Sequence, residues 1–325
     1  MKHMTATTLD PVVHRYLKHV RALGRRYDAE ERTLRSLSAF LLRKAEPDLR
    51  AGFFDEWCHT FEKLSPNVRR FRQRTVRKFC LYRQRTEPQC FVPDINLFVR
   101  PQPYAATPII LTPAQIAQLL QLADRCKPTA QTPLQPQLLR IAVVLLYTAG
   151  LRRGELLRLT LADVDAQAGV LRVRESKFHK SRLVPLSTDA RRELRRYLKY
   201  RLVPTLGIAP TSALLCNLSR GQKGYTGAGL RDAIRKLLLR GRIWDDEGRI
   251  PRTHDFRHTF AVQALLRWYR QGADVQSNLP KLALYMGHVS IVSTAYYLRW
   301  IPELRELASD RFAKHFGYLV QGGGS

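Results

Sequence analysis

The sequence has 325 residues, 45% of them hydrophobic, which is enough apolar material for the cores of two domains. Its 55 lysines and arginines exceed its 27 acidic residues and give a formal net charge of +28 at pH 7, which favours a polyanionic partner over a merely basic, ribosomal-type surface. The longest apolar run, residues 141–147, is far short of the ~20 residues that span a bilayer, and five scattered cysteines without a CxxC pair argue against a structural zinc site.

Four amphipathic helices are predicted in the N-terminal part of the chain, at residues 12–24, 30–44, 51–64 and 65–85. Apolar residues recur in them at helical spacing, as Leu34, Leu37 and Leu41 do in the second. Such helices fit a small bundle, so we expect a helical domain over residues 9–92.

The fourth of these helices is strongly basic and holds no acidic residue between positions 67 and 85. A solvated helix face normally mixes charges, because like charges four residues apart repel each other. A helix that lies along a DNA groove or backbone is therefore favoured over a merely solvated basic face. The candidate DNA contacts on this helix are Arg69, Arg70, Arg72, Arg74, Arg77 and Lys78.

A stretch rich in proline follows, at residues 93–110, and it lacks helical periodicity. Proline cannot donate a backbone hydrogen bond and stiffens an extended chain, so clustered prolines are typical of a spacer between domains. We expect an interdomain linker here.

The C-terminal part is predicted to be mainly helical with a small antiparallel sheet. Thr112 caps a helix at residues 111–124, and the helix at residues 138–150 is apolar nearly all round, which is typical of a buried core helix. Residues 169–186 alternate apolar and basic side chains on both sides of a polar tip, which indicates a hairpin. Helices return after Asp189.

Two short motifs bring ionisable groups together. In "GLRRGEL", Arg152 and Glu155 lie one helical turn apart, a pair that taken alone is usually a weak surface contact. In "THDFRHTF", His254, Arg257 and His258 share one helical face. That face suits an anion, because a guanidinium forks onto two phosphoryl oxygens and imidazoles transfer protons. A zinc site is disfavoured, since a cation stands between the two histidines.

The tip of the predicted hairpin, "SKFHK", is also basic. Lys177 or Lys180 can reach from it into a neighbouring groove, although most hairpin lysines only aid solubility. We count Lys180 and Arg182, which begins the second strand, among the candidate DNA contacts.

Near the C-terminus, "GHVSIVSTAYY" places two adjacent tyrosines after a Gly-His pair. Neighbouring residues of a helix point about 100° apart, so Tyr296 and Tyr297 cannot do the same job. In a helix through this stretch, Tyr296 would join an apolar stripe, whereas Tyr297 would share a more polar face with Ser293 and Thr294. We therefore expect Tyr296 to be structural and Tyr297 to be chemical.

These motifs, in this order, resemble those of the tyrosine recombinases, the phage integrases and their Xer-type relatives. The matching stretches are "GLRRGEL", "KFHKSRLVPL", "HDFRH" and "MGHVSIVSTAYY", and Gln115 stands where an acid is common. The resemblance covers residues 107–316 by motif. It implies a SAM-like core-binding domain over residues 9–92 and a catalytic domain over residues 111–317, which together form a clamp around DNA. Residues 318–325 are a tail that ends in what resembles an artificial Gly-Ser linker.

The resemblance also implies a role for each motif residue. Arg152 and Arg257 bind the scissile phosphate, Lys177 is the general acid, His254 and His288 complete the pocket, Tyr297 is the nucleophile, and Glu155 and His258 give support. Two arginines offset the charge that builds up in the transition state, so we expect neither a metal nor a cofactor.

The expected activity is site-specific DNA recombination or integration through a covalent 3′-phosphotyrosyl intermediate and a Holliday junction, without ATP. The expected partner is double-stranded DNA with an inverted-repeat core site, bound by a homotetramer or by a mixed assembly with related recombinases. An Xer-like or transposon-borne role is favoured, in the cytoplasm at the nucleoid and without a membrane partner.

Two alternatives stay open. One is a DNA-binding regulator without catalysis, and the other is a topoisomerase IB-like or telomere-resolving enzyme that uses the same chemistry. The predicted C-terminal helix at residues 303–317 docks either on a neighbouring subunit or on its own domain.

Overall fold

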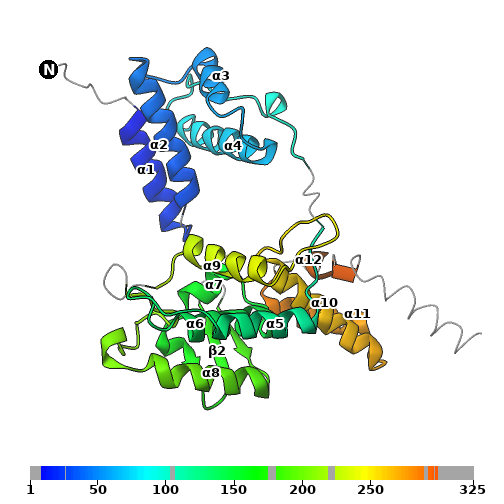
Figure 1. The fold of residues 1–325 in the computed structure, drawn as a ribbon. Coiled ribbons are helices and arrows are strands. Elements are labelled where there is room, and N and C mark those ends of the chain that lie inside the picture. The colour runs from blue at the N-terminus through cyan, green and yellow to red at the C-terminus, as the bar shows by residue number, and fades with distance from the viewer. Residues whose placement is uncertain are drawn as a thin grey trace, which may run out of the picture. The chain divides into compact units, whose positions relative to one another are not determined.

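A computed structural model of the chain describes residues 9–25, 27–102, 107–174, 181–218, 224–288, 292–295 and 297–298. The chain divides into two compact units, Met1–Ala106 and Thr107–Ser325 (Figure 1). Each unit has an apolar core of its own. The architecture is mainly helical with one small antiparallel sheet, as the sequence predicted.

The first unit is built from helices, in chain order α1(Leu9–Ala22), α2(Asp28–Arg43), α3(Ala51–His59), α4(Pro66–Arg83) and the short 3-10 helix η1(Ile95–Leu97). The leucines that recur at helical spacing in α2 point into its core: Leu34, Leu37 and Leu41 are almost fully buried. The four helices expected from the sequence are thus present among the described residues.

Part of the proline-rich stretch packs onto the first unit instead of spanning a gap. Phe98 is buried in the core of this unit. Two arginines of α4 hold the same segment: Arg70 Nη1 donates to the Val99 carbonyl at 2.9 Å, and Arg77 donates to the Pro93 carbonyl. The expected linker therefore begins later than residue 93, because an aromatic anchor and two guanidinium groups fix its first part.

The second unit contains helices around a three-stranded sheet. Its elements in chain order are α5(Pro113–Asp124), α6(Gln135–Thr148), α7(Arg153–Arg158), η2(Leu161–Asp163), β1(Val164–Asp165), β2(Val170–Val173), β3(Arg182–Pro185), α8(Thr188–Arg201), η3(Pro204–Leu206), α9(Gly227–Arg240), α10(Asp255–Arg270), α11(Val275–Met286) and α12(Val292–Ala295). The strand order is β1-β2-β3 with antiparallel pairing, and Leu171 lies opposite Val184. The predicted hairpin is confirmed.

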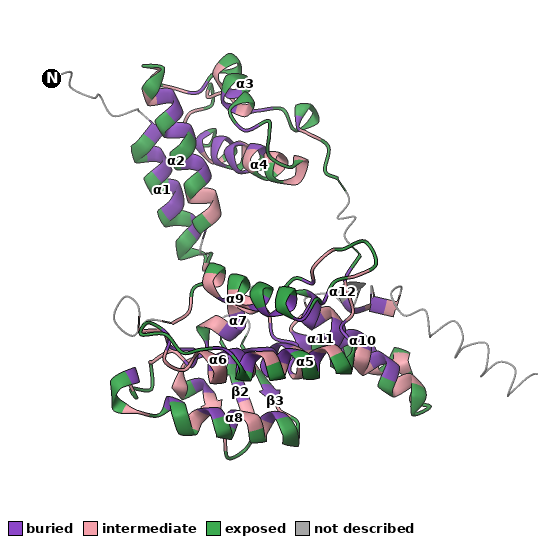
Figure 2. Ribbon diagram, in the orientation of Figure 1, coloured by how far each residue is buried: buried purple, intermediate pink, exposed green. Residues whose placement is uncertain are grey.

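Helix α6 forms the centre of this unit. It is buried along most of its length, as its continuous apolar sequence predicted (Figure 2). Helix α5 beside it begins with a capping box, in which Thr112 accepts from the Gln115 amide and the Gln115 side chain accepts from the Thr112 amide. None of the helices in the described part of the chain is both long and apolar enough to cross a membrane.

The turn after α6 requires glycine. Gly150 has a φ of +57°, and a Cβ atom there would lie 2.5 Å from a ring carbon of Phe260. Only glycine adopts this left-handed conformation without strain and leaves room for the ring. The turn directs the chain into α7, so that Arg152 stands at the start of that helix.

Candidate active site

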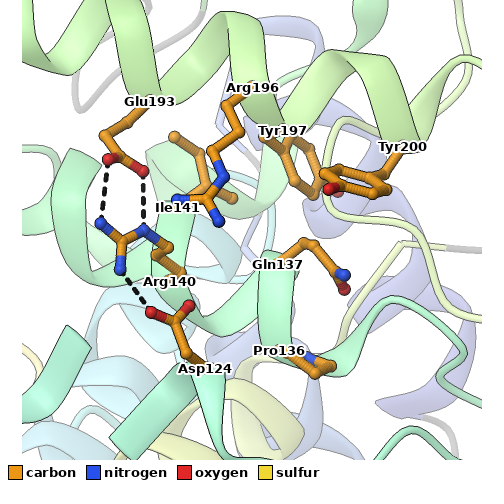
Figure 3. A pocket seen from close by; sticks show the side chains of 9 residues that line it. All are labelled: Asp124, Pro136, Gln137, Arg140, Ile141, Glu193, Arg196, Tyr197 and Tyr200. Atoms are coloured by element: carbon orange, nitrogen blue, oxygen red, sulfur yellow. Dashed lines mark hydrogen bonds and ion pairs between the residues drawn. The ribbon is translucent and has the colours of Figure 1, made fainter. Parts of the chain in front are cut away.

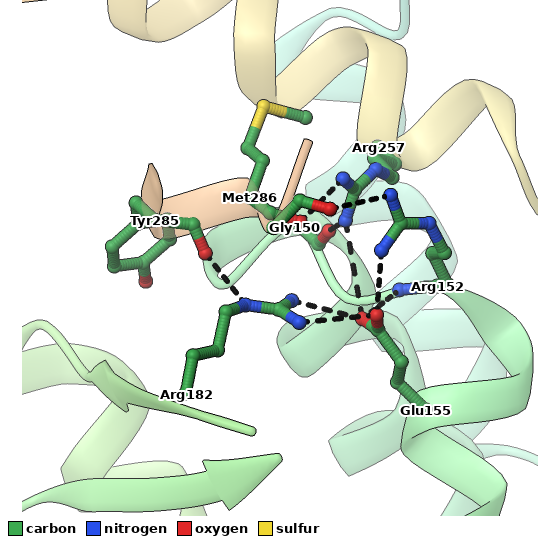
Figure 4. A network of polar contacts seen from close by, with 8 residues as sticks. Gly150, Arg152, Glu155, Arg182, Arg257, Tyr285 and Met286 are labelled. Atoms are coloured by element: carbon green, nitrogen blue, oxygen red, sulfur yellow. Dashed lines mark hydrogen bonds and ion pairs between the residues drawn. The ribbon is translucent and has the colours of Figure 1, made fainter. Parts of the chain in front are cut away.

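Three arginines converge on the carboxylate of Glu155, which is 2% exposed (Figure 4). Arg152 Nη1 donates to Glu155 Oε1 at 2.7 Å, and its backbone amide donates to Oε2 at 3.0 Å. Arg182 donates to both oxygens of the same carboxylate, from Nη1 to Oε1 at 3.1 Å and from Nη2 to Oε2 at 2.9 Å. Arg257 Nη1 lies 3.9 Å from Oε2. One buried acid therefore organises cations from α7, β3 and α10.

The ionisation of Glu155 follows from these neighbours. Burial would raise the pKa of the carboxyl, but the hydrogen bonds from Arg182 and Arg152 outweigh burial and lower it to about 2. Glu155 is therefore a carboxylate at neutral pH. It serves as a fixed anchor for guanidinium groups and not as a proton donor.

The same arginines also bind the C-terminal end of α11. Three consecutive carbonyls there each accept from one of them: Tyr285 from Arg182 at 2.8 Å, Met286 from Arg257 at 2.6 Å, and Gly287 from Arg152 at 3.0 Å. The last carbonyls of a helix lack partners within it and carry the negative end of its dipole, so cations stabilise them. The helix end and the carboxylate together fix the arginines from two sides.

Arg257 is the most enclosed member of this cluster, at 1% exposure. Its Nη1 atom donates to the Gly150 carbonyl at 2.6 Å. Burial and the charge of Arg152 lower the pKa of its guanidinium to about 10, which still leaves it charged at neutral pH. Its Nε–H is buried without a hydrogen-bond partner among the described residues. A buried donor of this kind is stabilised by an anionic acceptor.

Three histidines and Tyr297 form a group of rings beside the arginines. The ring of His258 lies edge-on to His254 at 4.6 Å and to Tyr297 at 5.3 Å, and His288 stacks on Tyr297 at 6.1 Å between centroids. His288 Nδ1 is 2.7 Å from the hydroxyl of Thr294. The structure thus brings four residues of two separate sequence motifs together.

These histidines are neutral at pH 7. For His288, desolvation is the main cause and the charge of Arg257 the second, and together they lower its pKa to about 3. The same two causes lower the pKa of His254, although its side chain keeps contact with solvent. Desolvation, followed by His254, lowers the pKa of His258 to about 4. A neutral imidazole retains an acceptor nitrogen, so the group can take a proton or a hydrogen bond from a phenol.

Tyr297 is buried between histidine rings and an apolar cluster, and the sequence argument did not predict the apolar part. It is 3% exposed and belongs to the same buried cluster as Val262, Leu265 and Met286. Helix α12 ends at Ala295 and Tyr297 follows in a 3-10 turn, so the face of a straight helix does not describe its surroundings. The polar face expected for Tyr297 stays a prediction, because the side chain of Ser293 lies outside the described part of the chain. Tyr296 is outside the described residues.

Arg182 is the candidate DNA contact whose environment differs most from expectation. Its side chain is 9% exposed, and its guanidinium is occupied by Glu155 and Tyr285. Each of its three nitrogens thus donates to an acceptor within the protein. The alternation of side chains along a strand could have indicated this burial. Arg182 lies on the same face of β3 as the fully buried Val184, whereas Leu183 points outward.

The other candidate DNA contacts are distributed unevenly. Lys177 and Lys180 lie outside the described residues. On α4, Arg74 and Lys78 are exposed, whereas Arg72 stacks over the ring of Phe61 at 4.9 Å. Arg69 is half-buried, as are Arg70 and Arg77, which bind the backbone of the proline-rich segment.

A separate cavity of about 250 Å³ lies between α5, α6 and α8 (Figure 3). Arg140 forks onto Glu193 at its wall and also binds Asp124. The cavity shares no lining residue with the arginine cluster. Among the residues that the structure describes, no group of three or more histidines, cysteines and acids is placed to hold a metal ion.

Residues 110–302 match the phage integrase family. Two proteins of Sinorhizobium fredii named as integrase/recombinases, y4rB and y4rE, are 34% and 32% identical to this chain. The first alignment covers 95% of this chain and 98% of y4rB, and the second covers 94% and 96%. The tyrosine recombinase XerC of Chlamydia trachomatis is 28% identical over 54% of this chain and 51% of XerC.

Solved structures show the same fold. The Tn1549 transposon integrase in complex with transposon right end DNA has a TM-score of 0.60 at 20% identity, over 88% of this chain and 94% of that one. The XerH site-specific recombinase bound to a palindromic difH substrate has a TM-score of 0.58 at 17% identity, over 86% and 78%. The chain therefore belongs to the phage integrase family. Its assignment to the tyrosine recombinases, enzymes of DNA strand breakage and rejoining, is confirmed.

Proposed function

We propose that this protein is a site-specific recombinase that cleaves and rejoins DNA through Tyr297 and exchanges strands through a Holliday junction. The observation that carries the proposal is the convergence of Arg152 and Arg257 beside a tyrosine flanked by His258 and His288. Two cations offer a phosphodiester bidentate contacts, and the neighbouring phenol supplies a nucleophile.

The proposed reaction balances without an external energy source. The Tyr297 oxygen forms a bond to phosphorus, the bond from phosphorus to the 5′ oxygen breaks, and the phenolic proton passes to a neutral imidazole of the site. Lys177, outside the described residues, protonates the departing 5′ oxygen. A 5′ hydroxyl of another strand then reverses these steps, so the phosphotyrosyl bond conserves the energy needed for joining.

The arginines supply the largest part of the expected rate enhancement. Their guanidinium groups are held in place before DNA binds, by Glu155 and by the end of α11. Preorganised donors of this kind stabilise developing negative charge without a reorganisation cost at the moment of reaction. His254 and His288 complete the proposed pocket, with Glu155 and His258 in supporting positions.

The proposal extends to partners and location. The helical unit serves as the core-binding domain and the second unit as the catalytic domain, and together they enclose duplex DNA with an inverted-repeat core. The named relatives support a DNA substrate, since solved structures of the Tn1549 integrase and XerH contain DNA. Four copies, or a mixed assembly with related recombinases, act in the cytoplasm at the nucleoid.

The test begins with selection of the bound sequence from a randomised duplex library. A duplex with the selected site and a nick beside the cleavage position then traps the covalent intermediate, because the short 5′-hydroxyl fragment diffuses away. A denaturation-resistant protein–DNA product is expected. Binding without this product would identify a DNA-binding regulator. Product with relaxation of supercoiled DNA but no exchange between two marked duplexes would identify a topoisomerase-like enzyme.

We expect exposed cations of α4 to contribute sequence-independent affinity. Replacing Arg74 and Lys78 by alanine removes two exposed charges. Neither forms an ion pair with a side chain in the described part of the chain. The slope of log Kd against log salt should fall by about one for each lost phosphate contact. Binding of generic duplex DNA, measured between low and moderate salt, gives this slope.

The matched control is Arg35→Ala, which removes an arginine with a 75% exposed side chain from α2 of the same unit. It changes net charge without touching α4. An equal decrease in slope per charge removed, for Arg35→Ala and for the α4 replacements, would show that only net charge matters and would refute α4 as the DNA-binding surface.

A further inference from the structure

Arg182 stands outside the residues to which the proposed reaction gives a role, yet it is as firmly held as any of them. Its Nε–H donates to the Tyr285 carbonyl at 2.8 Å, and its two terminal nitrogens donate to the two oxygens of Glu155. Three directed bonds fix the plane of the guanidinium. All three of its nitrogens donate to protein acceptors, whereas the Nε–H of Arg257 has no partner among the described residues, so the group is placed to act on its protein neighbours.

The first neighbour is Glu155, which Arg182 shares with Arg152. Glu155 Oε1 accepts from a terminal nitrogen of each arginine, and Oε2 accepts from Arg182 and from the Arg152 amide. The fork of Arg182 therefore sets the plane of the carboxylate that receives Arg152. Without the fork, the carboxylate could rotate and Arg152 would lose the partner that orients it.

The second neighbour is the end of α11. Arg182 binds the Tyr285 carbonyl, and the Tyr285 hydroxyl donates back to the Pro185 carbonyl of β3 at 3.0 Å. Gly287 allows this close approach, because a Cβ atom there would lie 2.9 Å from Arg182 Nη1. The strand is thus joined to the turn that leads directly into His288.

The third effect is electrostatic. Three arginines share the single carboxylate of Glu155, which leaves two positive charges in excess at the site. If Arg182 were absent, Glu155 would offset one of the two phosphate-binding arginines. Arg182 thus keeps more of their charge available for a phosphodiester in a poorly hydrated site, where Coulomb interactions are strong.

We propose that Arg182 is a third arginine of the recombination site, a positioning residue that couples Glu155 to the end of α11 and so places Arg152 and His288 without touching DNA. This assignment rests on the proposed strand-cleavage function. It replaces the DNA contact that the sequence suggested for the same residue.

The test compares Arg182→Gln and Arg182→Lys with the wild-type protein on the nicked duplex at saturating protein concentration. Single-turnover formation of the covalent product should slow by about 100-fold for glutamine, the cost of misplacing a reacting group by about 1 Å. Lysine should restore only part of the rate, since an ammonium cannot fork onto a carboxylate. DNA affinity and its salt slope should stay at the wild-type values.

The matched control is Arg140→Gln. Arg140 forks onto Glu193 at 2.7 and 2.9 Å in the same unit, at the wall of the separate cavity (Figure 3). Loss of this fork should lower thermal stability and leave the cleavage rate of the folded protein unchanged. An equal rate loss in both variants, each corrected for its folded fraction, would reduce the role of Arg182 to stability and overturn the proposal.

A double-mutant cycle with Glu155→Gln gives a second measurement. If Arg182 acts through Glu155, its replacement should slow cleavage far less when Glu155 is already glutamine. Additive effects, or a lower salt slope in Arg182→Gln, would show a direct DNA contact and overturn the proposal. Absence of covalent product with the wild-type protein would contradict the proposed function itself, which is a distinguishable outcome.

Discussion

The Tyr297→Phe variant should bind the selected DNA site with wild-type affinity and form no covalent product. The substitution removes one oxygen, and the phenyl ring keeps its place in the buried cluster that includes Val262 and Leu265. Without the nucleophile, the arginines still bind the phosphate but no bond to phosphorus can form. We expect a loss on the order of 10³-fold or more, measured as denaturation-resistant complex on the nicked duplex.

Tyr296→Phe is the control, because it makes the same chemical change one residue earlier. It should retain covalent attachment at close to the wild-type level. Contacts of Tyr297 with His258 and His288 support this choice between the two tyrosines. If the Tyr296 variant loses attachment and the Tyr297 variant keeps it, the assignment of the nucleophile is wrong.

The Arg257→Lys variant should bind DNA but cleave it about 10²- to 10³-fold more slowly, as enzymes do when a preorganised transition-state donor is lost. Lysine retains the positive charge, but its three N–H groups radiate from one nitrogen and cannot reproduce the planar arrangement in which Nη1 and Nη2 bind the Gly150 and Met286 carbonyls and Nε–H is left for a phosphate. Single-turnover cleavage at saturating protein separates this loss from any change in affinity.

Arg201→Lys is the matched control for a buried arginine. Arg201 is fully buried at the end of α8, and it also donates to backbone carbonyls, those of Gly207, Ala213 and Leu214. Its replacement should lower the unfolding temperature and leave the cleavage rate per folded molecule unchanged. If both lysine variants cleave at the wild-type rate, Arg257 has no role in transition-state stabilisation.

Elements with strong local patterns could be predicted from the sequence. The helix around residue 141 is apolar nearly all round, which favours a buried helix at the centre of a unit. The hairpin follows from alternation, and the register of Leu171 with Val184 places two apolar residues on one face. Motif order along the chain also sufficed to group Arg152, Arg257 and His288.

Features that depend on distant contacts could not be predicted in the same way. Phe98 enters the core of the first unit through packing against helices far away in sequence, and its own segment has no periodicity. Arg182 was assigned to DNA because it is basic and follows a basic hairpin tip. Its partners Glu155 and Tyr285 are 27 and 103 residues away, so only the tertiary structure identifies them.

The environment of Tyr297 shows a further limit. Assigning its face required a continuous helix, whereas α12 ends at Ala295. Periodicity describes a side chain correctly only while the backbone keeps one conformation. The spacing from His288 does not depend on that assumption, and it is the basis on which Tyr297 is proposed as the nucleophile.

The end of α11 has a consequence for how the site changes state. Because one rigid helix presents all three carbonyls, an axial shift by a single residue's rise, about 1.5 Å, would break every arginine contact there at once. The three arginines would lose this support together and not one by one, while Glu155 and the Gly150 carbonyl would still bind them. Molecules would then divide into one population that is competent for cleavage and one that is not, with few intermediates. A neighbouring subunit that displaced this helix would change the number of active copies, while each active copy kept its full cleavage rate.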